Sequence, residues 1–218
     1  MKLPEPYYED DWTTIYHGDC LEIVPLLPAV DVVLTDPPYG IGLGYSVYDD
    51  TKDNLNQIVA EALPVWQAAA PVVAFTPGVG NVSAWPAPTW VLCWYMANAC
   101  SSTGKWGFNQ WQPIFVYGTD PFLRRRMGRR PDVIITAAPN NGRDKKLGHP
   151  CPKPIEAWRK VVARVSPSEN DFILDPMMGS GTTLEVCKNT GRKSIGIDID
   201  ESYCEIAAGR LSQEILPL

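Results

Sequence analysis

Asp31-Val-Val-Leu-Thr-Asp-Pro-Pro-Tyr-Gly40 opens as a short apolar run and ends in two consecutive prolines. An apolar run flanked by turn residues is typical of a strand that is buried on both faces, as inside a parallel sheet. Pro37 and Pro38 fix two φ angles and remove two backbone donors, so the strand must end before them. The stretch therefore predicts a stiff loop at the carboxyl end of a buried strand.

This loop carries hydrogen-bond acceptors beside an aromatic ring. The carboxylate of Asp36 and a neighbouring carbonyl can both accept from a planar amine, such as the exocyclic NH2 of a nucleobase, and Tyr39 can stack on the ring that bears the amine. A proline-rich turn after a core strand is the simpler interpretation of the same residues. The loop becomes strong evidence of chemistry only if the chain also contains a cofactor site.

The second informative segment begins with another short apolar strand, residues 171–175, followed by Pro176-Met-Met-Gly-Ser-Gly-Thr-Thr183. Its two glycines allow a tight turn close to a ligand, and the helix start that follows offers free N–H groups to an anionic group. A further strand, residues 194–197, ends in Asp198, at the position where doubly wound folds hold a ribose. The third glycine of the dinucleotide fingerprint is absent, which lowers the case for NAD.

Together these segments resemble the amino-group DNA methyltransferases that use S-adenosylmethionine. The family's catalytic motif, Asp/Asn/Ser-Pro-Pro-aromatic, is matched by residues 36–39, and its cofactor motif is matched by residues 175–183. A His-Pro-x-x-Lys-Pro segment is matched by residues 149–154, and a Gly-Asp pair after an early strand by residues 18–19. The resemblance extends from about residue 17 to residue 210, and the order of the motifs resembles the permuted β group.

The resemblance implies roles for particular residues. The catalytic residues are expected to be Asp36, Pro37, Pro38 and Tyr39. Cofactor binding is expected from Asp19, Cys20, Asp36, His149, Lys153, Asp175, Pro176, Met177, Gly179, Ser180, Gly181, Thr182, Thr183 and Asp198. No metal is expected.

The charge distribution predicts where nucleic acid binds. Between Thr119 and His149 there are eight basic and three acidic residues, a net charge of +5, which leaves −11 on the rest of this chain of net charge −6. A local basic patch on an acidic body suits a surface that meets phosphates on one side, although a solvated arginine loop has the same composition. The family keeps its target-recognition region here, so we expect DNA contacts from Arg124, Arg125, Arg126, Arg129, Arg130, Lys145 and Lys146.

Length and composition favour one soluble α/β domain. The 218 residues suffice for one well-buried core, with a small basic target-recognition insertion expected at about residues 119–148. The longest apolar run is too short to span a membrane, and the start has no signal-peptide core. Six scattered cysteines without a CxxC pair, and only two histidines, make a zinc site improbable and favour reduced thiols in a cytoplasmic protein of a bacterial cell or phage-infected host.

The predicted fold is a Rossmann-like methyltransferase fold with circularly permuted motif order. We expect a mostly parallel seven-stranded sheet with an antiparallel strand, formed by strands near residues 12–16, 31–35, 71–76, 89–95, 112–117, 171–175 and 194–197. If the strand at 171 lies beside the strand at 31, their carboxyl ends border one crevice, where the glycine loop faces Asp36. Residues 40–53 are expected to form a mobile loop, and Pro64 to kink or break the helix over residues 54–70.

The resemblance implies methyl transfer from S-adenosylmethionine to the N6 amine of adenine in double-stranded DNA, with the target base flipped out of the duplex. Adenine is expected because the family's Asp-Pro-Pro-Tyr form goes mostly with adenine. Cytosine N4 stays open, since both bases present the same amine, and methylation of RNA or of a glutamine side chain is a further alternative. A catalytically inactive DNA-binding module, a homodimer, and a restriction-modification, solitary or phage-encoded role also stay open. The recognised DNA sequence cannot be read from the chain.

Overall fold

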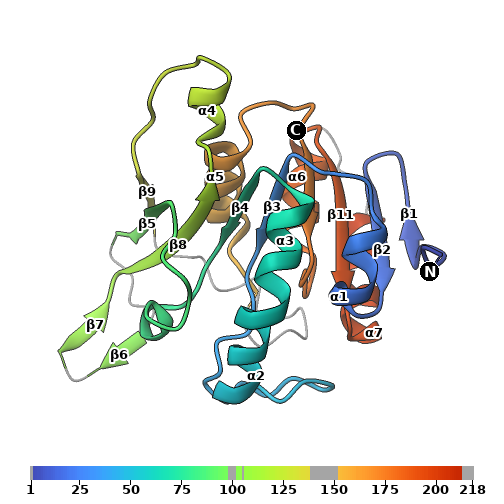
Figure 1. Ribbon diagram of the computed structural model, residues 1–218, viewed down its shortest axis with the longest axis horizontal. Helices are drawn as coiled ribbons and strands as arrows, with labels where there is room; N and C mark the ends of the chain where they lie inside the picture. Colours follow the sequence, from blue (N-terminus) through green and yellow to red (C-terminus); the bar gives the residue numbers. More distant parts are fainter. Residues whose placement is uncertain (1, 98–101, 105, 138–151, 213–218) are drawn as a thin grey trace.

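The computed structural model describes residues 2–97, 102–104, 106–137 and 152–212. Within these residues, nine strands form one sheet in the order β1-β2-β11-β10-β3-β4-β8-β5-β9 (Figure 1). These strands are β1 (Tyr8–Glu9), β2 (Thr13–His17), β3 (Val32–Thr35), β4 (Val72–Phe75), β5 (Trp90–Met96), β8 (Trp111–Gly118), β9 (Val133–Thr136), β10 (Phe172–Asp175) and β11 (Lys193–Asp198). A separate two-stranded sheet consists of β6 (Ser102–Gly104) and β7 (Gly107–Asn109).

The mostly parallel sheet with an antiparallel strand is confirmed, but the predicted number of seven strands is wrong. Strands β2, β11, β10, β3 and β4 are parallel neighbours, and β8 runs antiparallel to both β4 and β5. The two additional strands lie at the edges, with β1 antiparallel to β2 and β9 parallel to β5. Both strands are short. Strand β9 lies within residues 119–148, for which the sequence predicted a basic insertion and no strand.

Helices cover both faces of the sheet (Figure 1). One face carries α1 (Cys20–Ile23), η1 (Val24–Leu26), α2 (Lys52–Gln57), η2 (Ile58–Ala62) and α3 (Leu63–Ala69). The other face carries α5 (Ile155–Val165), α6 (Thr182–Asn189) and α7 (Glu201–Leu211). The short elements η3 (Val79–Asn81) and α4 (Pro121–Arg124) lie in connections. Val32 and Leu34 pack in the α5 core whereas Val33 packs in the α3 core, which explains why β3 is apolar throughout.

Pro64 was expected to kink or break the helical region before β4. The helix continues through this proline without a break, but a π-helical segment directly precedes it. The segment η2 is a π-helix, in which the Leu63 N–H reaches the Ile58 carbonyl, five residues back. Proline cannot donate a backbone hydrogen bond, and the wider π turn directly before it absorbs this defect. The helices α2 and α3 therefore join without an intervening loop, and among the described residues no helix is long and apolar enough to cross a membrane.

The predicted crevice is confirmed by the register of β10 against β3. Ile173 is paired with Val32 and Leu174 with Val33, so the two parallel strands end side by side. Asp36 follows one strand and the glycine loop follows the other, at the same edge of the sheet. We call this the catalytic edge, and the opposite end of these strands the amino edge.

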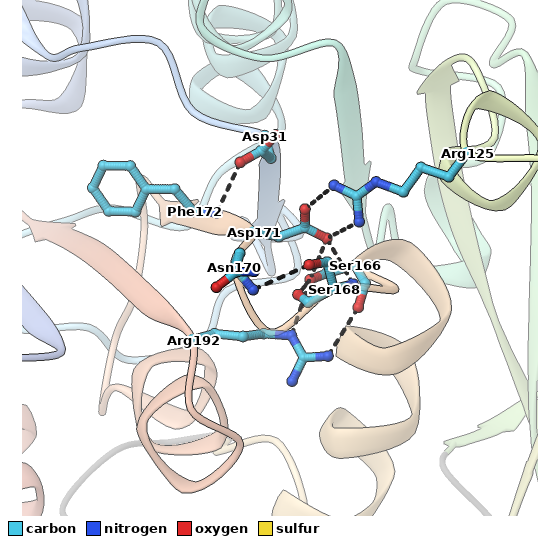
Figure 2. Close-up of polar contacts among 8 residues, drawn as sticks. All are labelled: Asp31, Arg125, Ser166, Ser168, Asn170, Asp171, Phe172 and Arg192. Atoms are coloured by element: carbon cyan, nitrogen blue, oxygen red, sulfur yellow. Dashed lines mark hydrogen bonds and ion pairs between the residues drawn. The ribbon is translucent and has the colours of Figure 1, made fainter.

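At the amino edge, a buried carboxylate organises the entry of the chain into β10 (Figure 2). Asp171 is 2% exposed and accepts both guanidinium nitrogens of Arg125, the Ser166 hydroxyl at 3.0 Å and the Ser168 N–H at 3.1 Å. Arg192 donates to the Ser166 hydroxyl and carbonyl, each at 3.0 Å. This network joins the end of α5, the start of β10 and the connection after β8.

The same network gives one arginine of the basic segment a partner within the protein. Arg125 was predicted to contact DNA, but its guanidinium binds Asp171 at the amino edge. A four-residue strand is roughly 13 Å long, so the catalytic edge is at least that far away. Four further candidates, Arg124, Arg126, Arg129 and Arg130, are exposed on and after α4 at that same end of the molecule (Figure 1). Lys145 and Lys146 lie outside the described residues.

Replacing Asp171 with asparagine is expected to lower the free energy of unfolding by about 3 kcal/mol at pH 7, because it leaves the Arg125 charge without its buried partner. Burial acts to raise the pKa of Asp171, but hydrogen bonds from Arg125, Ser168 and Ser166 outweigh it and lower the pKa overall. A carboxyl with a lowered pKa stabilises the fold above about pH 4 and loses this effect as the pH falls further. Urea denaturation across pH 3–7 should show the difference between Asp171→Asn and the parent shrinking below about pH 4.

The control is Glu5→Gln, since the Lys2–Glu5 pair is 91% exposed at both ends and should leave the denaturation midpoint unchanged. Equal midpoints for Asp171→Asn and the parent at pH 7 would contradict the structural role of Asp171.

Candidate active site

A second buried carboxylate, at the catalytic edge, connects the end of β3 to the start of α6. Asp175, 3% exposed, accepts the Thr35 hydroxyl at 2.7 Å and the Thr183 hydroxyl at 2.5 Å. The indole Nε1 of Trp158 in turn donates to the Thr183 hydroxyl at 2.8 Å, which adds α5 to the contact. Burial raises the pKa of Asp175 to about 7, although the hydrogen bonds from Thr183 and Thr35 favour its charged form. Asp175 thus holds the loop of Asp36 and the start of α6 in one arrangement.

Asp36 follows Thr35 directly, and three donors converge on its carboxylate. The Tyr39 hydroxyl donates to Oδ1 at 2.5 Å, the Thr76 hydroxyl also donates to Oδ1, and the Lys153 ammonium forms an ion pair with Oδ2. The Tyr39 oxygen lies 3.1 Å from the Thr76 oxygen, and the Lys153 Nζ lies 5.4 Å from the centre of the Tyr39 ring. Tyr39 of the same loop and two residues from distant parts of the chain, Thr76 and Lys153, therefore orient one partly exposed carboxylate.

A cavity of about 370 Å³ opens beside Asp36 at the catalytic edge. This volume lies within the range of roughly 300–1,000 Å³ that is usual for small-molecule sites. Its walls come from the β2–α1 turn, the loop after β3, the helices α2 and η2, and the loops after β10 and β11. Predicted site residues among its lining are Asp19, Cys20, Asp36, Pro38, Pro176, Met177, Gly179 and Asp198.

Carboxylates and apolar side chains divide the walls of this cavity. Asp19 caps α1 by accepting the Leu21 N–H at 2.8 Å. Asp198 accepts the Gly179 N–H at 2.8 Å, and burial raises its pKa to about 6. Carboxylates suit hydroxyl and amine donors, and Val47 and Tyr203 offer apolar surface to a planar ring. The lining thus fits a ligand with a ribose and a nucleobase.

A smaller cavity of about 40 Å³ is lined by the glycine loop together with Pro152 and Lys153. Its lining includes the predicted residues Lys153, Asp175, Ser180, Thr182 and Thr183. Asp36, Met177 and Gly179 border both cavities, so the two spaces meet at the candidate catalytic acid. Gly181 borders neither cavity, and a Cβ there would lie 2.7 Å from the Cβ of Ala207, so it serves the packing of α6 on α7. His149 lies outside the described residues.

The loop after Gly40, expected to be mobile, is organised by a buried carboxylate that sequence reasoning missed. Asp50, 5% exposed, accepts the N–H groups of Gly40 at 2.5 Å, Ile41 at 3.1 Å and Leu43 at 3.0 Å. The Ser46 hydroxyl donates to Asp200, which joins the loop to the start of α7. Tyr45, Val47 and Tyr48 of this loop therefore form one wall of the large cavity.

Thr76 was also missed, although a signal existed. It directly follows the apolar run of β4, the strand next to β3, and polar residues after neighbouring parallel strands gather at one edge. The described residues contain no group of three or more His, Cys, Asp or Glu side chains suited to a metal ion.

Comparison with known proteins agrees with this arrangement. A family model described as DNA methylase matches residues 85–209, more than half of the chain. The type II methyltransferase M.ScaI of Streptomyces caespitosus is 28% identical over 97% of this chain and 85% of its own length. The type II methyltransferase M2.DpnII of Streptococcus pneumoniae is 26% identical over 97% of this chain and 94% of its own length.

Solved structures share the fold. The M1.HpyAVI–SAM complex has a TM-score of 0.67 at 22% identity and covers 92% of this chain and 100% of that one. The cytosine-N4-specific PvuII DNA methyltransferase has a TM-score of 0.67 at 16% identity and covers 98% of this chain and 91% of that one. The motif order, the crevice and the matching family model together show that this chain belongs to the DNA methylase family, the S-adenosylmethionine-dependent methyltransferases of amino groups in DNA.

Proposed function

We propose that this protein transfers a methyl group to the N6 amine of adenine in double-stranded DNA, at a specific sequence, and that Asp36 is the catalytic acceptor. The observation that carries the proposal is the convergence of Tyr39, Thr76 and Lys153 on a carboxylate that borders both cavities. An exocyclic amine is a weak nucleophile because its lone pair is conjugated with the ring. A site that fixes both amine hydrogens favours a pyramidal nitrogen and directs the lone pair at the methyl group.

The carboxylate retains capacity for this task. An ionised carboxylate has about four lone-pair sites. Oδ1 accepts two hydroxyl groups and Oδ2 accepts the Lys153 ammonium, so Oδ2 keeps one site for an amine hydrogen among the described contacts. The Pro37 carbonyl supplies the second acceptor in this proposal. After transfer, the extra proton on nitrogen passes to Asp36 or to water, which restores a neutral secondary amine.

The methyl donor is held by the cavity residues. Asp19 and Asp198 face the large cavity, where their carboxylates suit a ribose and an adenine amine. Ser180, Thr182 and Lys153 face the small cavity, where hydroxyl groups and an ammonium suit an amino-acid carboxylate. When bound, S-adenosylmethionine supplies a methyl group made electrophilic by its sulfonium.

The target base must leave the duplex before it enters the site, because the amine of a paired base is not accessible to Asp36. Tyr39 was expected to stack on this base. Its hydroxyl instead holds the Asp36 carboxylate, and we propose that the same ring borders the entering base while remaining hydrogen-bonded.

Adenine is proposed from the Asp-Pro-Pro-Tyr form of the motif. Cytosine N4 is the second candidate, because its amine has the same geometry and the fold is similar to that of a cytosine-N4-specific enzyme. We propose a single catalytic domain with a small basic target-recognition insertion at about residues 119–148. An inactive DNA-binding module would not require the donors gathered on Asp36.

Asp36→Ala should lower the rate of methyl transfer at least about 100-fold, because the amine loses its main acceptor. The measurement is incorporation of labelled methyl into DNA, with cofactor affinity followed by calorimetry and expected to stay within a few-fold. Asp11→Ala, an exposed residue between β1 and β2, is the matched control. Hydrolysis of the product should release N6-methyladenine. Release of N4-methylcytosine would favour the second candidate, and transfer by Asp36→Ala at the parent's rate would remove Asp36 from the mechanism.

Thr76→Val should lower kcat roughly 10- to 100-fold, because it removes one hydrogen bond that orients Asp36 without changing the size of the side chain. The KM for the cofactor should hardly change, since Thr76 borders neither cavity. Thr76→Ser, which keeps the hydroxyl, should recover most of the rate. A kcat for Thr76→Val within two-fold of the parent's would show that Asp36 needs no help from this residue.

A further inference from the structure

The hairpin of β6 and β7 carries the most exposed aromatic side chains of the described residues. Gly104 pairs with Gly107, so only two residues form the turn, and Trp106 is one of them. Trp106 is fully exposed, and Phe108, two residues further on, is 64% exposed. Tryptophan is highly buried on average in folded proteins, so a fully exposed indole at the tip of a hairpin indicates a surface that binds another molecule.

The hairpin projects from the catalytic edge. It connects the end of β5 to the start of β8, and both strands run past the end of β4 at the catalytic edge. Phe115 is paired with Phe75, the last residue of β4, and Trp111–Ile114 of β8 extend beyond it. Neighbouring strands are about 4.8 Å apart, so β8 and β5 lie roughly 10–15 Å from β3 along this edge, and the hairpin begins at least about 13 Å beyond the end of β4. In Figure 1, β6 and β7 extend beyond the main sheet at the end where α2 lies, whereas α4 lies at the opposite end.

The charge of this region suits a polyanion. Residues 62–119 contain no acidic residue, and their one charged residue is Lys105, whereas the whole chain has 25 acidic residues. Phosphates approaching the hairpin thus meet no side-chain carboxylate from this stretch of chain, since all 25 acidic residues lie outside it. The basic residues around α4, by contrast, are at the amino edge, away from Asp36.

An extruded base leaves a gap in the DNA stack, and aromatic or apolar side chains on a projection are suited to filling such gaps. We propose that Trp106 is a wedge that enters the base stack next to the target base, with Phe108 packing against the neighbouring sugars and bases. This inference rests on the proposed function, in which duplex DNA meets the catalytic edge and one base leaves the stack. It assigns the opening of the duplex to a residue outside the catalytic motifs.

The test compares Trp106→Ala with the parent on two DNA probes that contain the methylated site, identified first by sequencing modified bases in DNA treated with the parent protein. One probe is fully paired, and in the other the target base is mispaired and already loosened. Trp106→Ala should weaken binding to the paired probe roughly ten-fold or more. The loss on the mispaired probe should be three-fold or less, because less stacking has to be broken there. Trp106→Phe should retain most of the affinity.

Trp90→Ala is the matched control. Trp90 is 60% exposed but stands at the start of β5, at the amino edge, so its loss should leave both affinities within two-fold. An equal loss on both probes, or no loss on either, would overturn the wedge. If Trp106→Ala instead converts a dimer into a monomer in light scattering while DNA affinity is unchanged, the hairpin binds a second copy and the proposal is wrong. A parent protein that methylates no DNA would overturn the proposed function itself.

Discussion

The buried carboxyl of Asp175 and the two hydroxyl groups that donate to it are the contact on which the catalytic edge depends. Thr35 precedes the candidate catalytic acid, and Thr183 lies in the first turn of α6, so one carboxyl sets the distance between acid and glycine loop. The indole N–H of Trp158, in α5, donates to the Thr183 hydroxyl. About 140 residues of chain separate Thr35 from Asp175, yet the strand register leaves them adjacent. Burial raises the pKa of this carboxyl to about 7, so near pH 7 about half of it is uncharged, which limits the cost of burying it.

The molecule separates two kinds of charged network at the two ends of the same strands. At the amino edge, Asp171 and Arg125 neutralise each other and close the end of the sheet. At the catalytic edge, Asp36 has a similar set of donors but stays partly exposed and borders open space. The difference in surroundings, not in the type of residue, separates a structural ion pair from a candidate catalytic one. Counting arginines in the sequence cannot make this distinction, because Arg125 lies between two other arginines. Only the fold places Asp171 beside it.

Much of the candidate site could be predicted because it lies in local patterns. The proline pair after an apolar strand and the glycine loop after another strand are defined by residues a few positions apart, and each restricts its own backbone directly. Residues that act through long-range contacts gave weak signals or none. Little in the sequence distinguishes Thr76 from other threonines, and its place beside Asp36 follows only from the pairing of β4 with β3. Asp50 is likewise an ordinary acid in a glycine-containing loop, and only the fold brings its carboxylate to three backbone N–H groups. The edge strands β1 and β9 were missed because two or four residues show too little periodicity.

By itself, the sequence determined the fold class and the order of the motifs, and it singled out the candidate acid and the glycine loop, since backbone stereochemistry and apolar periodicity act over short segments. Only the tertiary structure decided which charged groups meet. It places Arg125 beside Asp171, Lys153 beside Asp36, and the Trp106 hairpin at the catalytic edge. The physical reason is that strand order and register bring together residues far apart in the chain, and an ion pair depends on distance in space.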